Sequence, residues 1–205
     1  MAVTSLPLPQ FLQKEWDWAQ HYFISPAEET NKNWVLFPEK IHGQFAILHA
    51  LSPRIMVAYA DSLEEFERHP IKSNNQRTGR AGMWDSFVRG AGAPPIKTPF
   101  GWLLFYHGTN HDQGVGYRIG AMLLDTDDPT KVLYRSHEPL LSPETPYEND
   151  WKAGVIYASG AVVKDGMLFL YYGGGDKTVN SAKVPLEKFL SEFMIPENRD
   201  SDKPV

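Results

Sequence analysis

The stretch APPIKTPFGWLLFYHGT, residues Ala93–Thr109, decides the fold of this chain. A short segment, residues 93–98, leads into Pro-Phe-Gly. An almost wholly apolar segment follows and ends in Tyr106 and His107. Glycine accepts the positive φ angles of tight turns and aromatic side chains favour strands, so the stretch predicts a β-hairpin. This hairpin is either buried packing alone or a support that holds Lys97 and His107 over a shared anion.

Two further stretches repeat the pattern of a short strand, a turn with glycine and a strongly apolar strand: LFPEKIHGQFAILHA (36–50) and ASGAVVKDGMLFLYYG (158–173). The turn glycines, Gly43, Gly101 and Gly166, recur at intervals of about 60 residues. Another strand and a polar turn follow each hairpin, in RIMVAYADSLEEF, YRIGAMLLDTDDPTKVL and VNSAKVPLEKFL. A four-stranded unit that recurs at this spacing is typical of the blades of a β-propeller.

We therefore predict an all-β fold, a β-propeller of about three blades in a single domain over residues 1–205. A closed ring needs roughly four to eight blades, so three blades make an incomplete propeller. A leading strand or two is expected before Asn31. Helical patterns are short: Leu63–Arg68 and Pro185–Phe193, the second of which opens a C-terminal helix and tail near 185–205.

Composition excludes several classes of function. The net charge of −5 and the lack of a basic block argue against nucleic acid as a partner. The chain has no cysteine, hence no disulfide frame, thiolate zinc site or cysteine nucleophile. Its first residues do not read as a signal peptide, and no apolar run approaches the ~20 residues of a membrane span. We expect a cytoplasmic protein that does not bind membranes, and the sequence leaves a homo-oligomer open.

The repeated stretches belong to blocks that resemble glycoside hydrolase family 130, the β-mannoside phosphorylases and related mannosidases. The resemblance runs from about Phe11 to Leu190 and rests on five blocks in order: NKNWVLFPEKIHGQFAILH, GAGAPPIKTPFGWLLFYHG, YRIGAMLLDTDDPTKVLYRS, PLLSPETPYEN and GVIYASGAVVKDGMLFLYYGGGD. It implies a five-bladed propeller with the active site at its axis. It also implies cleavage of β-mannosidic bonds with phosphate or water, so the expected partner is a β-mannoside oligosaccharide or related glycan. Inorganic phosphate is then a co-substrate, and no other cofactor is expected.

The catalytic residue has no assignment. The family's proton donor is an Asp in an E-D-P-R block of an early blade, and this sequence contains no such block. The nearest string, LSPRIMVAYAD, follows FPEKIHG and so stands at the wrong place in the order. We expect the chain to begin after the blade that carries the acid. The alternative to an enzyme is a non-catalytic propeller fragment that binds sugar or phosphate.

The resemblance assigns phosphate binding to Lys97, Tyr106 and His107. A phosphate carries up to two negative charges near neutral pH, for which lysine supplies a point charge while a phenol and an imidazole supply directional donors. The alternative is that His107 caps a strand and Lys97 is solvated. Family phosphorylases also place an Arg after the His of the second block, where this chain has Ala50. Arg54 or Arg89 are the candidates to replace it.

The resemblance assigns sugar contacts to Asp176, Tyr117, Arg118 and His49. From the residues alone, a glycine-flanked Asp176 is equally a turn residue, and Tyr117 and Arg118 equally a strand edge.

Acidic residues elsewhere offer no metal site or acid–base pair. The acids of DTDDP, Asp125, Asp127 and Asp128, lack the glycine and the terminal Glu of an EF-hand loop, so we expect a polar turn and no metal. Glu39 and Glu148 are of the right type for an acid–base pair, but nothing in the sequence brings them together.

Overall fold

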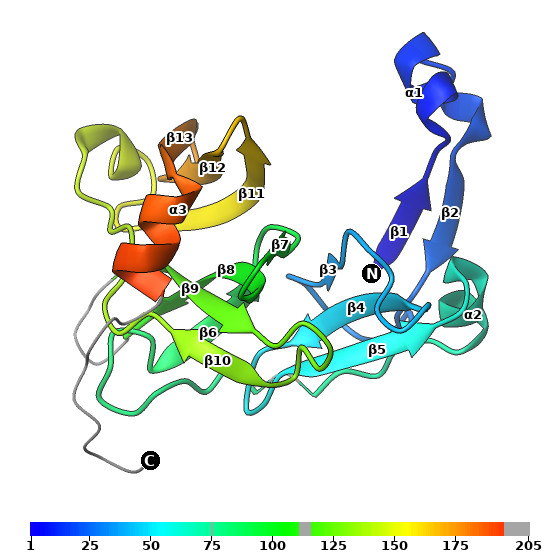
Figure 1. The fold of residues 1–205 in the computed structure, drawn as a ribbon, viewed down its shortest axis with the longest axis horizontal. Coiled ribbons are helices and arrows are strands. Elements are labelled where there is room, and N and C mark those ends of the chain that lie inside the picture. Colours follow the sequence, from blue (N-terminus) through cyan, green and yellow to red (C-terminus); the bar gives the residue numbers. More distant parts are fainter. Residues whose placement is uncertain (75, 111–115, 195–205) are drawn as a thin grey trace.

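The structure is a computed structural model that describes residues 1–74, 76–110 and 116–194. Its body consists of three antiparallel sheets (Figure 1). Their strands are β3 (Val35–Leu36), β4 (Phe45–Ala50) and β5 (Met56–Ala60); β6 (Phe87–Ala91), β7 (Ile96–Thr98), β8 (Gly101–Thr109), β9 (Arg118–Leu124) and β10 (Val132–Arg135); and β11 (Ile156–Lys164), β12 (Met167–Gly174) and β13 (Thr178–Pro185). The expectation of a mostly β chain with repeated hairpins is confirmed.

The three turn glycines have the backbone conformation that their positions require. Gly43, Gly101 and Gly166 have φ angles of 81°, 137° and 73°. Side chains other than glycine rarely adopt these angles, so each glycine fixes where a hairpin reverses. Gly101 is also closely packed, because a Cβ there would lie 2.2 Å from the carbonyl oxygen of Leu124.

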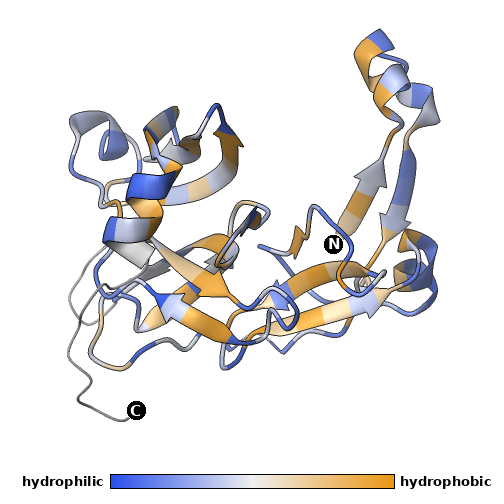
Figure 2. Cartoon of the chain, viewed as in Figure 1, coloured by the Kyte–Doolittle hydropathy of each residue, from blue (hydrophilic) through white to orange (hydrophobic). Residues whose placement is uncertain are grey.

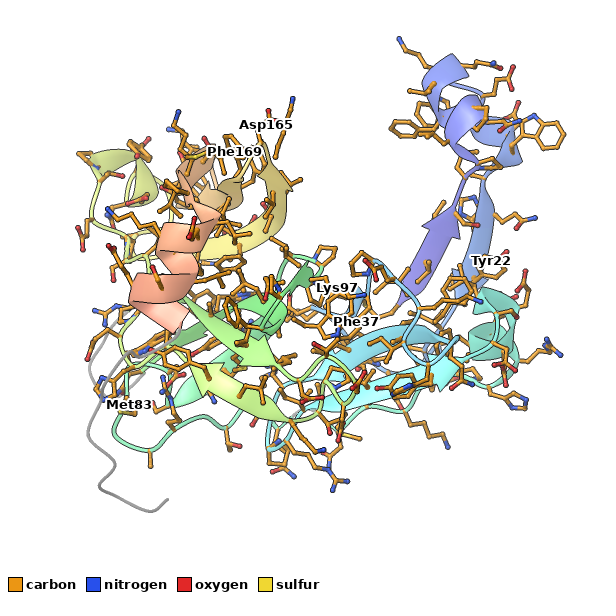
Figure 3. All side chains as sticks on the ribbon, viewed as in Figure 1. Tyr22, Phe37, Met83, Lys97, Asp165 and Phe169 are labelled. Atoms are coloured by element: carbon orange, nitrogen blue, oxygen red, sulfur yellow. The ribbon has the colours of Figure 1, made fainter. Side chains whose placement is uncertain are left out.

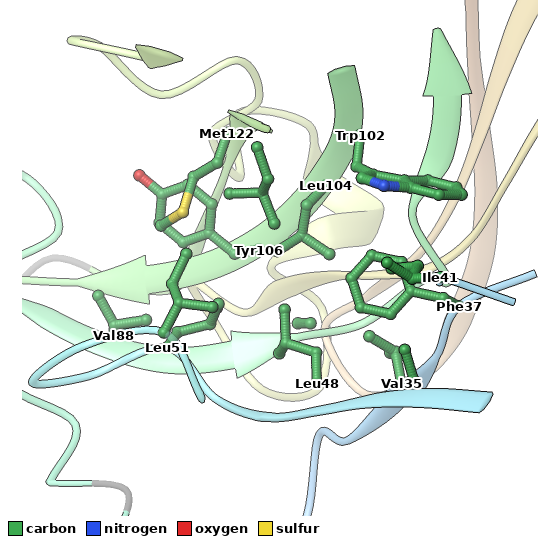
Figure 4. Close-up of a cluster of buried hydrophobic side chains, with 14 of the residues drawn as sticks. Val35, Phe37, Ile41, Leu48, Leu51, Val88, Trp102, Leu104, Tyr106 and Met122 are labelled. Atoms are coloured by element: carbon green, nitrogen blue, oxygen red, sulfur yellow. The ribbon is translucent and has the colours of Figure 1, made fainter. Parts of the chain in front are cut away.

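Strand β8 is buried along its whole length because a sheet covers each of its faces. Trp102, Leu104 and Tyr106 point toward the sheet of β3–β5 and form a cluster with its apolar residues (Figure 4). Leu103 and Phe105 point the other way and pack against β11–β13. A strand with two buried faces reads as a continuous apolar run, which is why WLLFY shows no alternation of apolar and polar residues.

The N-terminal segment forms an arm that extends from the body (Figure 1). Its elements are the paired strands β1 (Ala2–Ser5) and β2 (Gln20–Phe23), with α1 (Leu8–Gln13) and the 3-10 helix η1 (Trp16–Trp18) between them. Tyr22 and Ile24 anchor its base in a cluster with residues of β4 and α2 (Leu63–Arg68). Toward the tip, the colouring by hydropathy shows apolar residues among polar ones (Figure 2).

The helices are short, as the sequence predicts. Ser62 is the N-cap of helix α2, and its hydroxyl accepts a hydrogen bond from the amide of Glu65 at 3.3 Å. At the C-terminal end, α3 (Leu186–Phe189) continues into the π-helix η4 (Leu190–Met194). The 3-10 helix η3 (Pro146–Glu148) precedes β11. In the described part of the chain, no helix is long and apolar enough to cross a membrane.

The predicted uniform four-stranded units are wrong in detail. The sheets contain three, five and three strands. In the middle sheet, β7 pairs with the first part of β8 and β6 with its last part, so two short strands share one edge. The strand β8 is long enough to hold both, and its other edge pairs with β9.

Candidate functional site

A β-bulge in β6 places Arg89 at the end of the middle sheet. Val88 pairs with Gly108 and Gly90 with His107, so Arg89 has no partner residue on β8. Bulges of this kind redirect a side chain and are frequent beside active sites. The guanidinium carbon of Arg89 lies 5.3 Å from the ring centre of Tyr117. Arg89 thus projects from the sheet beside an aromatic ring instead of entering the core.

The segment before β3 is packed against this bulge. The side-chain amide of Asn33 donates a hydrogen bond to the carbonyl oxygen of Arg89 at 2.9 Å. A Cβ on Gly90 would lie 2.6 Å from the Cβ of Asn33, so only glycine permits the approach. The contact brings Lys32, one residue earlier, toward Arg89.

A polar pocket of about 130 Å³ opens between these segments. Its lining residues share hydrogen-bonding side chains or positive charge: Thr30, Asn31, Lys32, Trp34, Ser73, Arg77 and Arg89. Three of them are cationic, and no carboxylate of the described residues lines the pocket. Within the described ranges, no ion pair involves Lys32 or Arg89.

The cations of this pocket act on one another electrostatically. The pKa of Lys32 is lowered, mainly by the charge of Arg89, then by partial burial and by the charges of Arg77 and Lys152. Like charges held together disfavour the protonated lysine, and an anion placed among them would relieve that repulsion. The charge of the arrangement therefore favours an anion.

His107 lies at the same end of the sheet and is nearly buried, with 6% of its surface exposed. Burial, together with the charges of Arg89 and Lys32, lowers its pKa to about 4, so the imidazole is neutral near pH 7. Its ring centre is 6.1 Å from that of Tyr117 and equally far from that of Tyr157. Its Nδ1 atom is buried and has no hydrogen-bond partner among the described residues. In a neutral imidazole one ring nitrogen is a donor and the other an acceptor, and Nδ1 is the one that lacks a described partner.

Lys97 does not lie near His107, and the prediction that the two converge on one anion is wrong. Lys97 pairs with Trp102, five residues before His107, which at ~3.3 Å per residue amounts to roughly 16 Å along β8. Paired residues share a face and successive residues alternate, so Lys97 and His107 also point to opposite faces. Lys97 instead forms an ion pair with Glu39 at 2.5 Å, and Figure 3 shows it beside Phe37.

Tyr106 also points away from His107. It is fully buried in the cluster of Figure 4, and burial raises the pKa of its phenol strongly. Its hydroxyl donates a hydrogen bond to Asp85 at 2.6 Å and accepts one from Nε of Arg135 at 3.1 Å. Its polar atom is thus occupied within the protein, and the predicted convergence with His107 is wrong for Tyr106 too.

Asp85 is the centre of a buried polar network that sequence reasoning missed. The carboxylate is fully buried, and Nε of Arg80 donates to it at 2.9 Å. A terminal nitrogen of Arg135 donates to it at 2.5 Å. Each partner comes from a different segment, so only the tertiary structure assembles the network. Asp85, Arg135 and Tyr106 form a structural unit that joins β8 to β10.

The residues predicted to contact sugar are divided between the two faces. Tyr117 lies beside His107 and Arg89, as stated above. Arg118 pairs with Gly108, and strand alternation directs it to the face opposite His107. His49 contacts two residues that line the pocket, Ser73 and Trp34. Its Nδ1 atom lies 3.1 Å from the hydroxyl of Ser73, and its ring packs edge-on against Trp34 at 5.6 Å.

Asp176 follows β12 in a left-handed conformation, with φ of 52°. Its carboxylate accepts a hydrogen bond from Nζ of Lys152 at 3.0 Å. Lys152 is also one of the cations that lower the pKa of Lys32, so the Lys152–Asp176 pair is within electrostatic range of the pocket. The structure therefore connects Asp176 to the cationic residues of the pocket through Lys152.

The acidic residues considered for metal or acid–base chemistry have local roles. The carboxylate of Asp125 accepts hydrogen bonds from the amides of Asp127 and Asp128, which makes DTDDP a polar turn. Glu148 caps η3 and accepts a hydrogen bond from Tyr172 at 2.9 Å. Among the described residues, no group of three or more potential ligands is placed to hold a metal.

Comparison with known proteins defines the family to which this chain belongs. The family model for glycoside hydrolase family 130, described as β-1,4-mannooligosaccharide phosphorylase, matches residues 15–194. The chain therefore belongs to glycoside hydrolase family 130, as the sequence blocks indicate.

Individual relatives are mannoside phosphorylases. The chain is 40% identical over 173 residues to the 1,2-β-oligomannan phosphorylase of Thermoanaerobacter sp. (strain X514), a match that covers 83% of this chain and 55% of the relative. The solved complex of β-1,2-mannobiose phosphorylase from Listeria innocua with β-1,2-mannobiose is 34% identical, with a TM-score of 0.67. That match covers 82% of this chain and 47% of the Listeria chain. The chain spans about half the length of the curated relatives it matches.

Proposed function

We propose that the protein takes part in phosphorolysis of β-mannosides and that the pocket around Lys32 and Arg89 binds the inorganic phosphate. The observation that carries the proposal is the group of cations, with no lining carboxylate among the described residues, together with the buried Nδ1 of the neutral His107 at the same end of the sheet. The family relatives that bear phosphorylase names support the reaction class.

Phosphate is favoured over water as the attacking group because water needs no anion site. Arg89 offers a planar fork of donors to two phosphate oxygens, Lys32 offers a point charge, and the imidazole of His107 offers one directional N–H. In the reaction, a phosphate oxygen bonds to the anomeric carbon while the glycosidic C–O bond breaks and the leaving oxygen takes a proton. The products are mannose 1-phosphate and the shortened glycan. A donor for that proton has no assignment in the 205 residues.

We also propose that the three sheets are consecutive blades of the family's five-bladed propeller. Their face-to-face stacking around β8 supports this arrangement, since each blade buries its faces against its neighbours. The pocket then lies where segments from neighbouring blades meet, with Lys32 ahead of the first sheet and Arg89 in the second.

A second function, binding without cleavage, is favoured by one observation, the lack of an E-D-P-R block in this sequence. General acid catalysis is typically worth 10²–10⁴-fold, and glycoside cleavage depends on it. Under this alternative the chain keeps the phosphate pocket and a sugar surface.

The test uses the 205-residue chain with β-1,2- and β-1,4-mannobiose, each with and without inorganic phosphate. Mannose 1-phosphate formed only when phosphate is present supports phosphorolysis. Free mannose formed equally without phosphate contradicts it. Calorimetric titration with inorganic phosphate gives the second readout: saturable binding without product identifies the binding function, and no binding overturns the phosphate pocket.

A further inference from the structure

We propose that Arg77 is the second guanidinium of the phosphate pocket and takes the place of the arginine that the family carries where this chain has Ala50. The proposal rests on the proposed function and names a residue for the same pocket.

The backbone around Arg77 is fixed in a conformation that suits glycine better than arginine. Its φ angle is 61°, in the left-handed region, which costs a residue with a Cβ roughly 1–2 kcal/mol. The Val88 amide donates to the carbonyl oxygen of Arg77 at 2.8 Å, and the Gly79 amide donates to that of Ser86 at 2.8 Å. The segment is thus hydrogen-bonded to the strand region that carries Arg89. If only the backbone mattered here, glycine would be the favoured residue, so an arginine at this position carries a cost in backbone strain.

The side chain of Arg77 lines the pocket together with Lys32 and Arg89. Its charge is one of the causes that lower the pKa of Lys32, so the two cations are close enough to interact. Arg77 and Arg89 come from neighbouring segments and present two guanidinium groups to one small polar cavity. Two planar guanidinium groups can donate paired hydrogen bonds to the three free oxygens of a phosphoryl group. A single lysine offers only a point charge and cannot form these paired bonds.

The surroundings of Ala50 explain why the second guanidinium comes from elsewhere. Ala50 is 2% exposed and pairs with Met56 of β5, so its side chain lies in a buried position. The neighbouring His49 directs its imidazole to Ser73, at the wall of the pocket. Arg54, an alternative on sequence grounds, is exposed and does not line the pocket. Of the arginines considered, Arg77 and Arg89 are the two that reach it.

The test compares Arg77→Gly with Lys14→Gly. Lys14 ends helix α1 on the N-terminal arm with φ of 60°, so both variants remove one positive charge and relieve the same backbone strain. We expect Arg77→Gly to bind inorganic phosphate about 10-fold or more weakly, since hydrogen bonds to charged groups contribute at this level. Lys14→Gly should bind as the unchanged protein does.

Arg77→Lys keeps the charge and the strain but removes the fork, and it should bind phosphate with an affinity between those of the unchanged protein and Arg77→Gly. It also serves as the readout if Arg77→Gly fails to fold. Parallel titrations with mannose 1-phosphate separate the two sources of a phosphoryl group. An equal loss for both ligands supports Arg77 at the phosphoryl position, and a loss confined to the sugar phosphate overturns it.

The outcomes separate the failure of this inference from that of the proposed function. Unchanged phosphate affinity in Arg77→Gly, with weakened affinity in Arg89→Met, overturns the role of Arg77 and leaves the phosphate pocket standing. An unchanged protein that binds no phosphate overturns both.

Discussion

Two groups of basic residues lie near the middle sheet, and they differ in how their charge is balanced. Arg80 and Arg135 both donate to the fully buried carboxylate of Asp85, and Tyr106 completes that network. Lys32 and Arg89 face a pocket without a lining carboxylate, and among the described residues neither forms an ion pair. The first group has its counter-charge inside the protein, whereas among the described residues the second has no carboxylate partner. Charge balance, more than residue type, therefore separates the structural arginines from the arginine that we propose binds phosphate.

The largest expected effect is a loss of stability in the first group, Arg80 and Arg135, whose charge Asp85 balances. Replacing Asp85 by Ala would leave two guanidinium groups and a buried phenol without their shared acceptor. Breaking a buried ion pair by removing one partner costs about 3–5 kcal/mol. We expect the free energy of unfolding, measured by urea denaturation, to fall by that amount. Glu39→Gln, which breaks the exposed pair with Lys97, serves as the control and should change it by less than about 1 kcal/mol. Equal losses in the two variants would contradict the distinction between buried and exposed pairs.

The second prediction concerns the pH dependence of stability through His107. Its pKa is about 4 in the folded protein and 6.5 ordinarily, so between these values the unfolded chain binds the proton more strongly. Stability should therefore fall as the pH is lowered from about 6.5 to about 4 and should not change through this group above 6.5. The difference corresponds to about 3 kcal/mol.

Urea unfolding at several pH values, with His107→Gln alongside, measures this contribution. The variant should lose most of the slope between pH 6.5 and 4. Some slope should remain, because burial lowers the pKa of His49 as well. An unchanged slope in the variant would show that His107 is not held neutral by burial.

Features of this chain that depend on residues close together in the sequence can be predicted from it, whereas features that depend on distant residues cannot. The hairpins at Gly43, Gly101 and Gly166 are predictable because a positive φ is a local requirement of the turn. Strand alternation would also have placed Tyr106 and His107 on opposite faces, since they are adjacent in one strand. The family blocks pointed to His107 and Tyr117, which the structure brings together.

The cationic pocket itself was not predictable from local pattern. The bulge at Arg89 exists only in the pairing of β6 with β8, and Lys32 reaches it through the contact of Asn33 with that bulge. A signal was present in the glycines of GAG, because Gly90 permits the close approach of Asn33. The sequence alone does not indicate which residue approaches these glycines.

The third prediction tests the second group of basic residues, Lys32 and Arg89. Arg89→Met removes the charge but keeps an unbranched side chain to pack beside Tyr117. We expect phosphate affinity, measured by calorimetry, to fall about 10-fold or more because a charged hydrogen bond is lost. The free energy of unfolding should change by less than about 1 kcal/mol, since the cation–π contact is worth ~0.5–1 kcal/mol at an exposed site. A large loss of stability with unchanged phosphate affinity would place Arg89 with the structural group.

The smallest expected effect is at Lys97, which sequence comparison assigned to phosphate and the structure places elsewhere. Its ammonium forms an ion pair with Glu39 in which both side chains are about half exposed, and it lies 5.6 Å from the ring centre of Trp102. Exposed pairs contribute about 0–1 kcal/mol, so Lys97→Met should change stability by no more than that. Because Lys97 and His107 lie on opposite faces of β8, phosphate affinity should be unchanged within error. A 10-fold weaker phosphate affinity in Lys97→Met, with unchanged affinity in Arg89→Met, would move the anion site to the other face of the sheet. That result would reverse the comparison between the two groups of basic residues.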